Sequence, residues 1–116
     1  MIIIGKSFSL ECAHTAQGAQ DERNRRIHGH SYVITLFWEA TTCTSQGFQL
    51  NLEDDADREI YKVRQTLDHR MLNDVLGVHA TMEALAEYIG KLLSPGICMV
   101  RVERPTVGMI CEWRRE

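Results

Sequence analysis

The hydrophobic pattern near the start of the chain has the period of two that is typical of a β-strand. From Ile2 to Ala13, the hydrophobic residues Leu10 and Cys12 fall on one face, and the polar residues Ser9 and Glu11 fall on the other. Successive side chains of a strand point to opposite faces, so residues two apart lie together. We therefore expect a strand from Ile2 to Ala13 with one buried face.

A second strand is predicted from His28 to Thr42, a run rich in the β-branched and aromatic residues that strands favour. The polar residues 15–26 that precede it show no periodicity and predict a loop long enough to be functional. After it, Ser45-Gln46-Gly47 predicts a turn, and Phe48 to Leu52 alternates as a short returning strand.

The hydrophobic period then changes to that of a helix. Acidic residues beginning at Glu53 suit a helix N-terminus, and apolar residues recur at helical spacing through Leu67. Residues 68–74 predict a loop, and a second helix follows from Thr81 to Leu93, with Thr81 as its N-cap. Two further strands are predicted at 98–102 and 108–113.

This order of elements predicts an α+β fold, with an antiparallel four-stranded sheet and two helices on one face. The other face of the sheet would still carry apolar residues, and oligomerisation is the simplest way to cover them. The length of 116 residues suits one domain, which we assign to residues 1–116.

Composition and charge narrow the functional classes. Hydrophobic residues make up 44% of the chain and charged residues 25%, both ordinary for a globular protein. The net charge of -3 provides no basic field for nucleic acid or an anionic membrane, and no apolar run is long enough to cross a bilayer. The cysteines lack disulfide-framework spacing, which predicts reduced thiols in a cytoplasmic protein. They are Cys12, Cys43, Cys98 and Cys111.

Histidines are the first candidate functional residues. His28 and His30 lie two apart on a predicted strand and share a face, and Gly29 between them adds no side chain. His14 follows the first strand on the face of Cys12, so pairing of the two strands would bring it to the same point. Three imidazoles with no fourth protein donor are typical of a catalytic zinc site. Two alternatives stay open: histidines that only form hydrogen bonds, and a fourth ligand from Cys12.

Asp68-His69 and Glu103 are the next candidates. A carboxylate beside a histidine can orient the ring and raise its pKa, which suits proton transfer. The alternative is a capped turn between the helices, since adjacent residues seldom face each other. Glu103, at the end of a predicted strand, is either a buried carboxylate suited to an amidine-like ligand edge or a solvated strand end.

The order and spacing of these residues resemble the family of 6-pyruvoyl-tetrahydropterin synthases and 6-carboxy-tetrahydropterin synthases. The matching pieces extend over nearly the whole chain, and the histidine and Leu-Asp-His elements are the most specific of them. The pieces are Cys12-Ala13-His14, His28-Gly29-His30-Ser31-Tyr32, Gly47-Phe48, Leu67-Asp68-His69, Leu72-Asn73, Thr81-Met82-Glu83 and Val100 to Glu103.

The resemblance implies a tunnelling fold. In that fold, three subunits join their sheets into a β-barrel, and two such rings stack into a homohexamer with sites between subunits. The resemblance also implies that His14, His28 and His30 bind Zn²⁺, and that the substrate is 7,8-dihydroneopterin triphosphate. Zinc would then bind the side-chain hydroxyls of this pterin.

The same resemblance assigns catalytic and binding roles. Asp68 and His69 would join a cysteine in proton transfer, and Glu103 would hold the guanidine-like edge of the pterin, helped by Thr81. The cysteine of the family stands four residues before the first histidine of the paired motif, where this chain has Asn24. A carboxamide does not titrate near neutral pH, whereas a thiolate can abstract a proton from carbon.

Other residues near Asn24 bear on this departure. Asp21 and Glu22 in the same loop are candidates to replace the cysteine, and Cys12 is a less suitable one because it lies on a strand. Residues 23–26 contain three arginines, which suit either a triphosphate or a solvated loop balanced by acids.

Three hypotheses follow. The first is a zinc-dependent, lyase-like enzyme that acts on 7,8-dihydroneopterin triphosphate or a related pterin, with altered chemistry because Asn24 replaces the cysteine. The second is a catalytically inactive homologue that binds a pterin. The third is an oligomer in which zinc and the histidines serve only structure. Removing Glu103 distinguishes these hypotheses, because the protein would lose pterin binding under the first two hypotheses and would be unaffected under the third.

Overall fold

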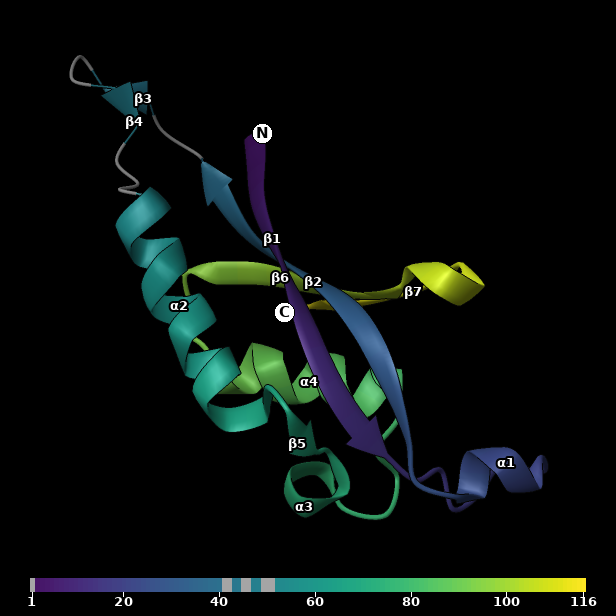
Figure 1. The fold of residues 1–116 in the computed structure, drawn as a ribbon. Helices are drawn as coiled ribbons and strands as arrows, with labels where there is room; N and C mark the ends of the chain where they lie inside the picture. The colour runs from purple at the N-terminus through teal and green to yellow at the C-terminus, as the bar shows by residue number, and fades with distance from the viewer. Residues whose placement is uncertain (1, 41–42, 45–46, 49–51) are drawn as a thin grey trace.

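A long antiparallel pair of strands dominates the fold in the computed structural model, which describes residues 2–40, 43–44, 47–48 and 52–116 (Figure 1). β1 (Ile2–His14) pairs with β2 (His28–Ala40) along its whole length. β2 also pairs with β6 (Ile97–Arg104), which pairs in turn with β7 (Met109–Arg114). All three pairings are antiparallel, as predicted.

The sheet has a fifth strand, so the prediction of a four-stranded antiparallel sheet is corrected to a mixed sheet. β5 (Arg70–Met71) lies parallel to β1, in the order β5-β1-β2-β6-β7. The backbone N–H groups of His69 and Leu72 donate to the carbonyls of Glu11 and Ala13, each at 2.7 Å. Two residues are too few for an alternating pattern, which is why the sequence predicts only a loop at this position.

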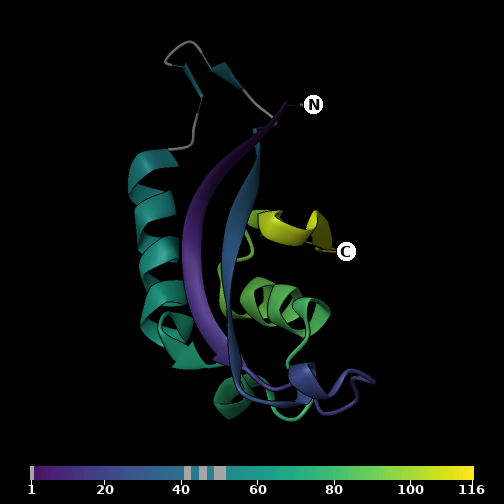
Figure 2. The same cartoon turned by 45° about the vertical axis from the view of Figure 1, so that its right-hand side comes forward.

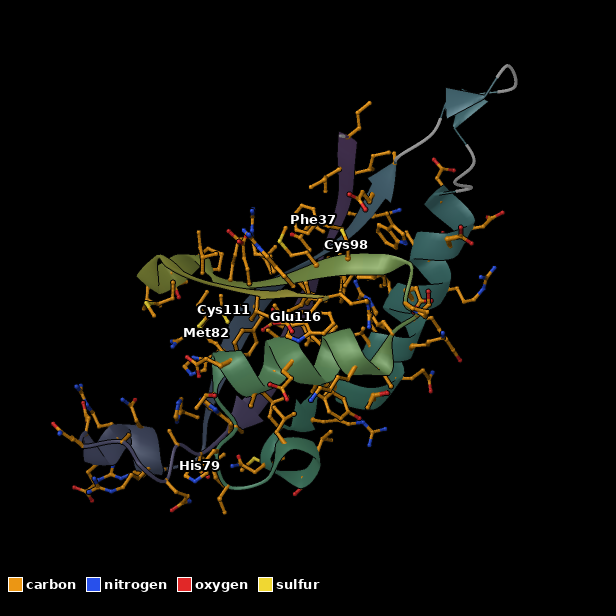
Figure 3. The ribbon with its side chains drawn as sticks, turned by 180° about the vertical axis from the view of Figure 1, so that it is seen from behind. Phe37, His79, Met82, Cys98, Cys111 and Glu116 are labelled. Atoms are coloured by element: carbon orange, nitrogen blue, oxygen red, sulfur yellow. The ribbon has the colours of Figure 1, made fainter. Side chains whose placement is uncertain are left out.

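Both main helices pack on one face of the sheet. α2 (Leu52–Leu67) lies along β1, and α4 (Met82–Leu92) lies against β6 and β7 (Figures 2 and 3). Their apolar stripes join one face of β1, β2 and β6 in a single core cluster, as amphipathic helices require. Its fully buried members include Leu10, Tyr32, Ile34, Leu36, Val63, Leu67, Leu85, Ile89, Val100 and Val102. The assignment of 1–116 to one domain stays a prediction.

Two predicted loops contain one-turn helices. α1 (Glu22–Arg25) begins after Asp21, whose carboxylate accepts a hydrogen bond from the N–H of Arg23 at 2.9 Å. α3 (Asn73–Leu76) follows β5. A single turn is too short for its hydrophobic period to be seen in the sequence.

Within the described part of the chain, no helix is both long and apolar enough to cross a membrane.

Two short strands and the ends of longer elements complete the comparison with the predicted boundaries. β3 (Cys43–Thr44) and β4 (Gly47–Phe48) form a small separate sheet. The predicted turn at Ser45-Gln46-Gly47 and the returning strand from Phe48 to Leu52 fall mostly outside the described residues. β7 begins one residue later than predicted, because Gly108 has a φ of 67° and ends a 3-10 turn, Pro105–Val107, instead of opening the strand.

The sheet face away from the helices mixes polar pairs with exposed apolar residues. Arg101 forms an ion pair with Glu112 at 2.8 Å, and the hydroxyls of Ser7 and Thr35 are hydrogen-bonded at 2.7 Å. Ile110, on the same face by its pairing with Glu103, is 60% exposed. The face therefore carries apolar residues as predicted, and oligomerisation stays a prediction.

Candidate metal centre

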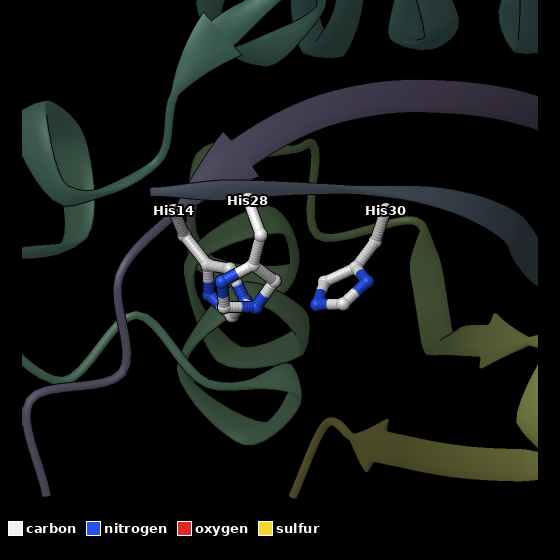
Figure 4. A group of neighbouring side chains, drawn as sticks. All are labelled: His14, His28 and His30. Atoms are coloured by element: carbon white, nitrogen blue, oxygen red, sulfur yellow. Dashed lines mark hydrogen bonds between the residues drawn. The ribbon is translucent and has the colours of Figure 1, made fainter. Parts of the chain in front are cut away.

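Three histidines converge on the helix side of the sheet (Figure 4). His14 lies directly opposite His28 in the strand register, and His30 lies two residues further along β2. The three ring centroids are 4.5, 4.8 and 4.7 Å apart, and one ligand atom of each residue lies within 4.8 Å of the others. This confirms the prediction that strand pairing brings His14 to His28 and His30.

Backbone carbonyls fix the ring protons of two of these histidines. His14 Nδ1 lies 2.7 Å from the carbonyl oxygen of Ala80, and His28 Nδ1 lies 2.8 Å from that of Arg26. Because a carbonyl oxygen only accepts, each Nδ1 carries the proton and each Nε2 presents a lone pair. The two Nε2 atoms are 3.0 Å apart. In the neutral rings these two lone pairs, with His30 beside them, point toward one region, so the donor set fits a metal ion.

The environment of His14 and His30 favours the neutral form of these two rings. Burial is the largest cause that lowers the pKa of His14, and it lowers the pKa of His30 to about 4, with the positive charge of Arg104 as the next cause for His30. Neutral imidazole is the form that binds a metal. Protons therefore compete less with a metal ion for the ring nitrogens of His14 and His30.

Cys12 lies beside the three histidines but does not join them. It is opposite His30 in the strand register, and its Sγ donates to the carbonyl of Leu67 at 3.3 Å. Burial, followed by the charges of Asp68 and Glu11, raises the pKa of Cys12 to about 12. A thiol that stays protonated is a poor metal ligand and a poor base. The geometry therefore disfavours Cys12 both as a fourth ligand and as the substitute for the missing cysteine.

Asp68 and His69 contact each other at the end of α2. His69 Nδ1 lies 3.2 Å from Asp68 Oδ2, and Asp68 Oδ1 accepts from the N–H of Glu11 at 3.0 Å. His69 has a φ of 58°, a left-handed conformation that is uncommon outside glycine and often occurs at functional sites. Burial alone would raise the pKa of Asp68, but the N–H of Glu11 and the His69 ring hold it below its usual value.

His69 also lines a surface hollow of about 520 Å³. The lining includes Glu11, Gly29, His30 and Ser31, and of these Glu11 and Ser31 project from the sheet face opposite to that of the His30 ring. Between the described residues, no hydrogen bond or ring contact joins His69 to the three histidines. The geometry thus brings Asp68 and His69 together as a pair, beside a hollow that is separate from the point where the three histidine rings meet.

The start of α4 lies next to the metal centre. Thr81 caps this helix, since its hydroxyl accepts from the N–H of Ala84 at 3.2 Å. Thr81 directly follows Ala80, whose carbonyl holds the ring of His14. The predicted N-cap is confirmed, and the predicted binding residue Thr81 lies one residue from a group that orients a metal ligand.

Glu103 and Asn24 lie away from the three histidines. Glu103 is paired with Val33 and Ile110, so it projects from the sheet face opposite to that of His30. Asn24 is exposed in α1, and its backbone carbonyl accepts from the N–H of Ala16 at 2.9 Å. One chain by itself therefore does not gather all of the predicted site residues around one point.

Arg104 is a charged residue near the metal centre to which the sequence assigns no role. It ends β6 on the same sheet face as the buried residue Val102, and its positive charge acts on both His14 and His30. The sequence could have indicated this placement of Arg104, because Arg104 follows Val102 by two residues on a strand with one buried face.

The fold and the site define a class of protein: an α+β protein with a mixed sheet, two main helices and a three-histidine centre that could hold one metal ion. The family profile of 6-pyruvoyl tetrahydropterin synthase matches residues 3–115. The chain belongs to the 6-pyruvoyl tetrahydropterin synthase family, as its resemblance in sequence predicted.

Solved structures show the same fold at low sequence identity. The 6-pyruvoyl tetrahydropterin synthase of Caenorhabditis elegans is 18% identical, with a TM-score of 0.76 over 99% of this chain and 96% of that one. An uncharacterised protein of Wolinella succinogenes is 14% identical, with a TM-score of 0.76 over 99% and 98%. The Plasmodium vivax synthase is 17% identical, with a TM-score of 0.65 over 99% and 100%. No curated protein matches the sequence significantly.

Proposed function

We propose that this chain is a zinc-dependent 6-pyruvoyl/6-carboxy-tetrahydropterin synthase-like protein that acts on 7,8-dihydroneopterin triphosphate or a related pterin. The observation that carries the proposal is the pair of facing Nε2 atoms of His14 and His28, 3.0 Å apart, in a chain of this family. His30 completes a three-nitrogen donor set. When bound there, Zn²⁺ would polarise a hydroxyl or carbonyl of the pterin side chain.

His69 is the proposed proton carrier, and Asp68 positions it. If the Nδ1 proton of His69 is directed at the Asp68 carboxylate, 3.2 Å away, the lone pair of His69 is at Nε2. The His69 side chain is 78% exposed and lines the hollow of about 520 Å³, so a ligand in that hollow can reach it. Its Nε2 would then accept a proton from the ligand, while the carboxylate stabilises the resulting imidazolium.

The proposed chemistry is altered because Asn24 supplies no second base. The two acids nearest to it in sequence are already engaged: Asp21 with Arg23 at 2.8 Å, and Glu22 with Arg26 at 3.2 Å. A rearrangement that moves two protons between carbon atoms would need another base besides His69. A carbon–carbon cleavage, or another reaction that needs a single base, is therefore easier to support.

Glu103 and Thr81 are the proposed contacts of the pterin ring. A carboxylate can accept two hydrogen bonds from the adjacent N–H groups of a guanidine-like edge. Glu103 and the metal centre project from opposite faces of the sheet, so one small ligand contacts both only if they belong to different copies. This favours a homo-oligomer, a trimer or hexamer whose sheets close into a β-barrel with sites between subunits.

A catalytically inactive, pterin-binding homologue is the alternative. Asn24 favours it, because Cys12 stays protonated and cannot replace the missing thiolate. In a third option, zinc and the histidines only stabilise an oligomer. This option would not explain why His69 adopts a left-handed backbone conformation. The free thiols of Cys12, Cys98 and Cys111 agree with the proposed cytoplasmic location.

Incubation of the zinc-loaded protein with 7,8-dihydroneopterin triphosphate, followed by mass spectrometry, tests the proposal. A new pterin that disappears with His28→Ala and with His69→Ala, but persists with His79→Ala, would establish an enzyme, and its mass would identify the bond broken. Unchanged substrate that stays bound would support the inactive homologue, and gain of turnover with Asn24→Cys would then explain it. Absence of binding, with no effect of Glu103→Ala, would leave only the structural role of zinc.

A further inference from the structure

Arg104 occupies a defined position beside the three histidines. Val33 pairs with Glu103 in the register of β2 and β6, so the next step along the two strands places Arg104 beside Tyr32. Tyr32 shares its sheet face with His30, and the two rings meet edge to face with centroids 5.8 Å apart. The positive charge of Arg104 contributes to the lowered pKa of His14 and of His30, which agrees with this placement.

The guanidinium of Arg104 lacks a partner in the described part of the chain. Its Nε is buried and has no hydrogen bond, and no ion pair or hydrogen bond to its other nitrogens is present among the described residues. Arginines elsewhere on β6 and β7 are engaged: Arg101 and Arg114 both bind Glu112, at 2.8 and 3.1 Å. A partly buried cation with an unsatisfied donor costs free energy unless something outside the chain pairs with it.

Charge balance indicates what that partner is. The neighbourhood already contains the positive charge of Arg104, and a bound Zn²⁺ would add two more. Among the described residues, no carboxylate is one of the groups that act on the pKa of His14 or of His30, although a nearby carboxylate would raise it. Three histidine ligands leave a fourth zinc position open to a ligand, and an anionic group there would also pair with the guanidinium.

We propose that Arg104 is a specificity-determining residue that binds an oxyanion, a carboxylate or phosphate, of a ligand whose neighbouring atoms reach the metal centre. The planar guanidinium presents two parallel N–H donors that match the two oxygens of a carboxylate or phosphate. This inference rests on the proposed function, because it takes the ligand to be a pterin bound at the three histidines. It adds that the pterin carries its negative charge next to the metal.

Two fluorescent probes that differ only in one carboxylate test the inference: pterin and pterin-6-carboxylate, titrated into the zinc-loaded protein. We expect pterin-6-carboxylate to bind at least about tenfold more tightly, since hydrogen bonds to a charged partner are strong. Arg104→Gln should reduce this ratio to about one, and Arg104→Lys should retain part of it. Arg101→Gln is the matched control, because Arg101 lies on the same strand but projects to the other face, and it should keep the full ratio.

Equal affinities of the two probes in the unchanged protein, or a ratio that survives Arg104→Gln, would overturn the inference while leaving pterin binding intact. Failure of both probes to bind would count against the proposed function instead. The inference would then be decided on the Co²⁺-loaded protein. Acetate or inorganic phosphate should change its visible spectrum in the unchanged protein but not in Arg104→Gln, and the more effective anion would distinguish carboxylate from phosphate. An unchanged spectrum would overturn the inference.

A carboxylate from a second copy of the chain is the competing partner for Arg104. In that case Arg104→Gln would shift the protein to a smaller species in size-exclusion chromatography with light scattering, and anion binding would be unaffected. This outcome would also overturn the inference. An unchanged oligomer together with lost anion selectivity is the result that we expect.

Discussion

The Nε2 atoms of His14 and His28 face each other at 3.0 Å, while the Nδ1 of each ring is held by a backbone carbonyl. The two carbonyls belong to Ala80, just before α4, and to Arg26, just before β2. Each ring is thus oriented from outside the strand that carries it. This is the arrangement by which outer groups usually orient metal-binding histidines.

One zinc ion per chain is the first expected consequence. His28→Ala should abolish stoichiometric zinc binding, because it removes one of the two facing Nε2 atoms, whereas His69→Ala should leave it intact. Zinc at about 100 times its dissociation constant should stabilise the unchanged protein by about 2.7 kcal/mol. Metal analysis after dialysis, with thermal unfolding with and without zinc, measures both effects. Zinc that remains at one per chain in His28→Ala would contradict this site.

The Asp68 carboxylate should make the stability of the fold depend on acid pH. Its pKa is lowered on folding, so its contribution is fully present above its unfolded pKa of about 3.9 and is lost as the pH falls through the lower folded-state pKa. Asp68→Asn should therefore cost about 1 kcal/mol at pH 7 and less at pH 3. Urea unfolding at both pH values measures the difference. Asp74→Asn, an exposed acid, is the control, and an equal cost of Asp68→Asn at both pH values would exclude this linkage.

The long elements could be predicted because their patterns are long. β1 and β2 each have 13 residues, and their alternation was enough to place His14, His28 and His30 on one face. The fourteen-residue separation of His14 and His28 then became a direct contact through strand pairing. The sequence alone therefore predicted the candidate metal centre, because its geometry follows from the period of a strand.

The features that the sequence did not reveal depend on long-range contacts or on single residues. β5 exists only because Arg70 and Met71 meet the edge of β1, and a two-residue segment has no period of its own. The pairing of Asp68 with His69 was one of two interpretations of the sequence, but the left-handed backbone that accompanies this contact at His69 was not predicted from the side-chain pattern. The protonated state of Cys12 follows from its burial, and burial is a property of the assembled core.

Cys12 should react much more slowly with alkylating reagents than an ordinary thiol. It is 7% exposed, and its pKa is raised to about 12, so very little thiolate is present at neutral pH. Iodoacetamide labelling mapped by mass spectrometry should show Cys12 unmodified until the protein unfolds. In Asn24→Cys, the new exposed thiol should be labelled rapidly. Fast labelling of Cys12 accompanied by loss of turnover would instead identify Cys12 as the substitute for the family's cysteine.

The close approach of α4 and β7 supplies a test of the fold that is independent of the site. Gly90 lies in α4, and a Cβ on it would overlap the six-membered ring of Trp113. Alanine favours a helix by about 1 kcal/mol over glycine, whereas overpacking a core typically costs about 1–3 kcal/mol. We therefore expect Gly90→Ala to destabilise the protein by about 1 kcal/mol in urea unfolding. Gly18→Ala, with nothing near its Cβ position, should not destabilise it.

The sign of the Gly90→Ala effect should reverse when the ring of Trp113 is removed. In the Trp113→Leu background the overlap is gone, and only the helix preference of alanine remains, so Gly90→Ala should then stabilise by up to about 1 kcal/mol. The double-mutant cycle isolates the contact, because the two residues touch each other directly. If Gly90→Ala destabilises equally in both backgrounds, the overlap with Trp113 is not its cause, and the packing of α4 on β7 differs from that described.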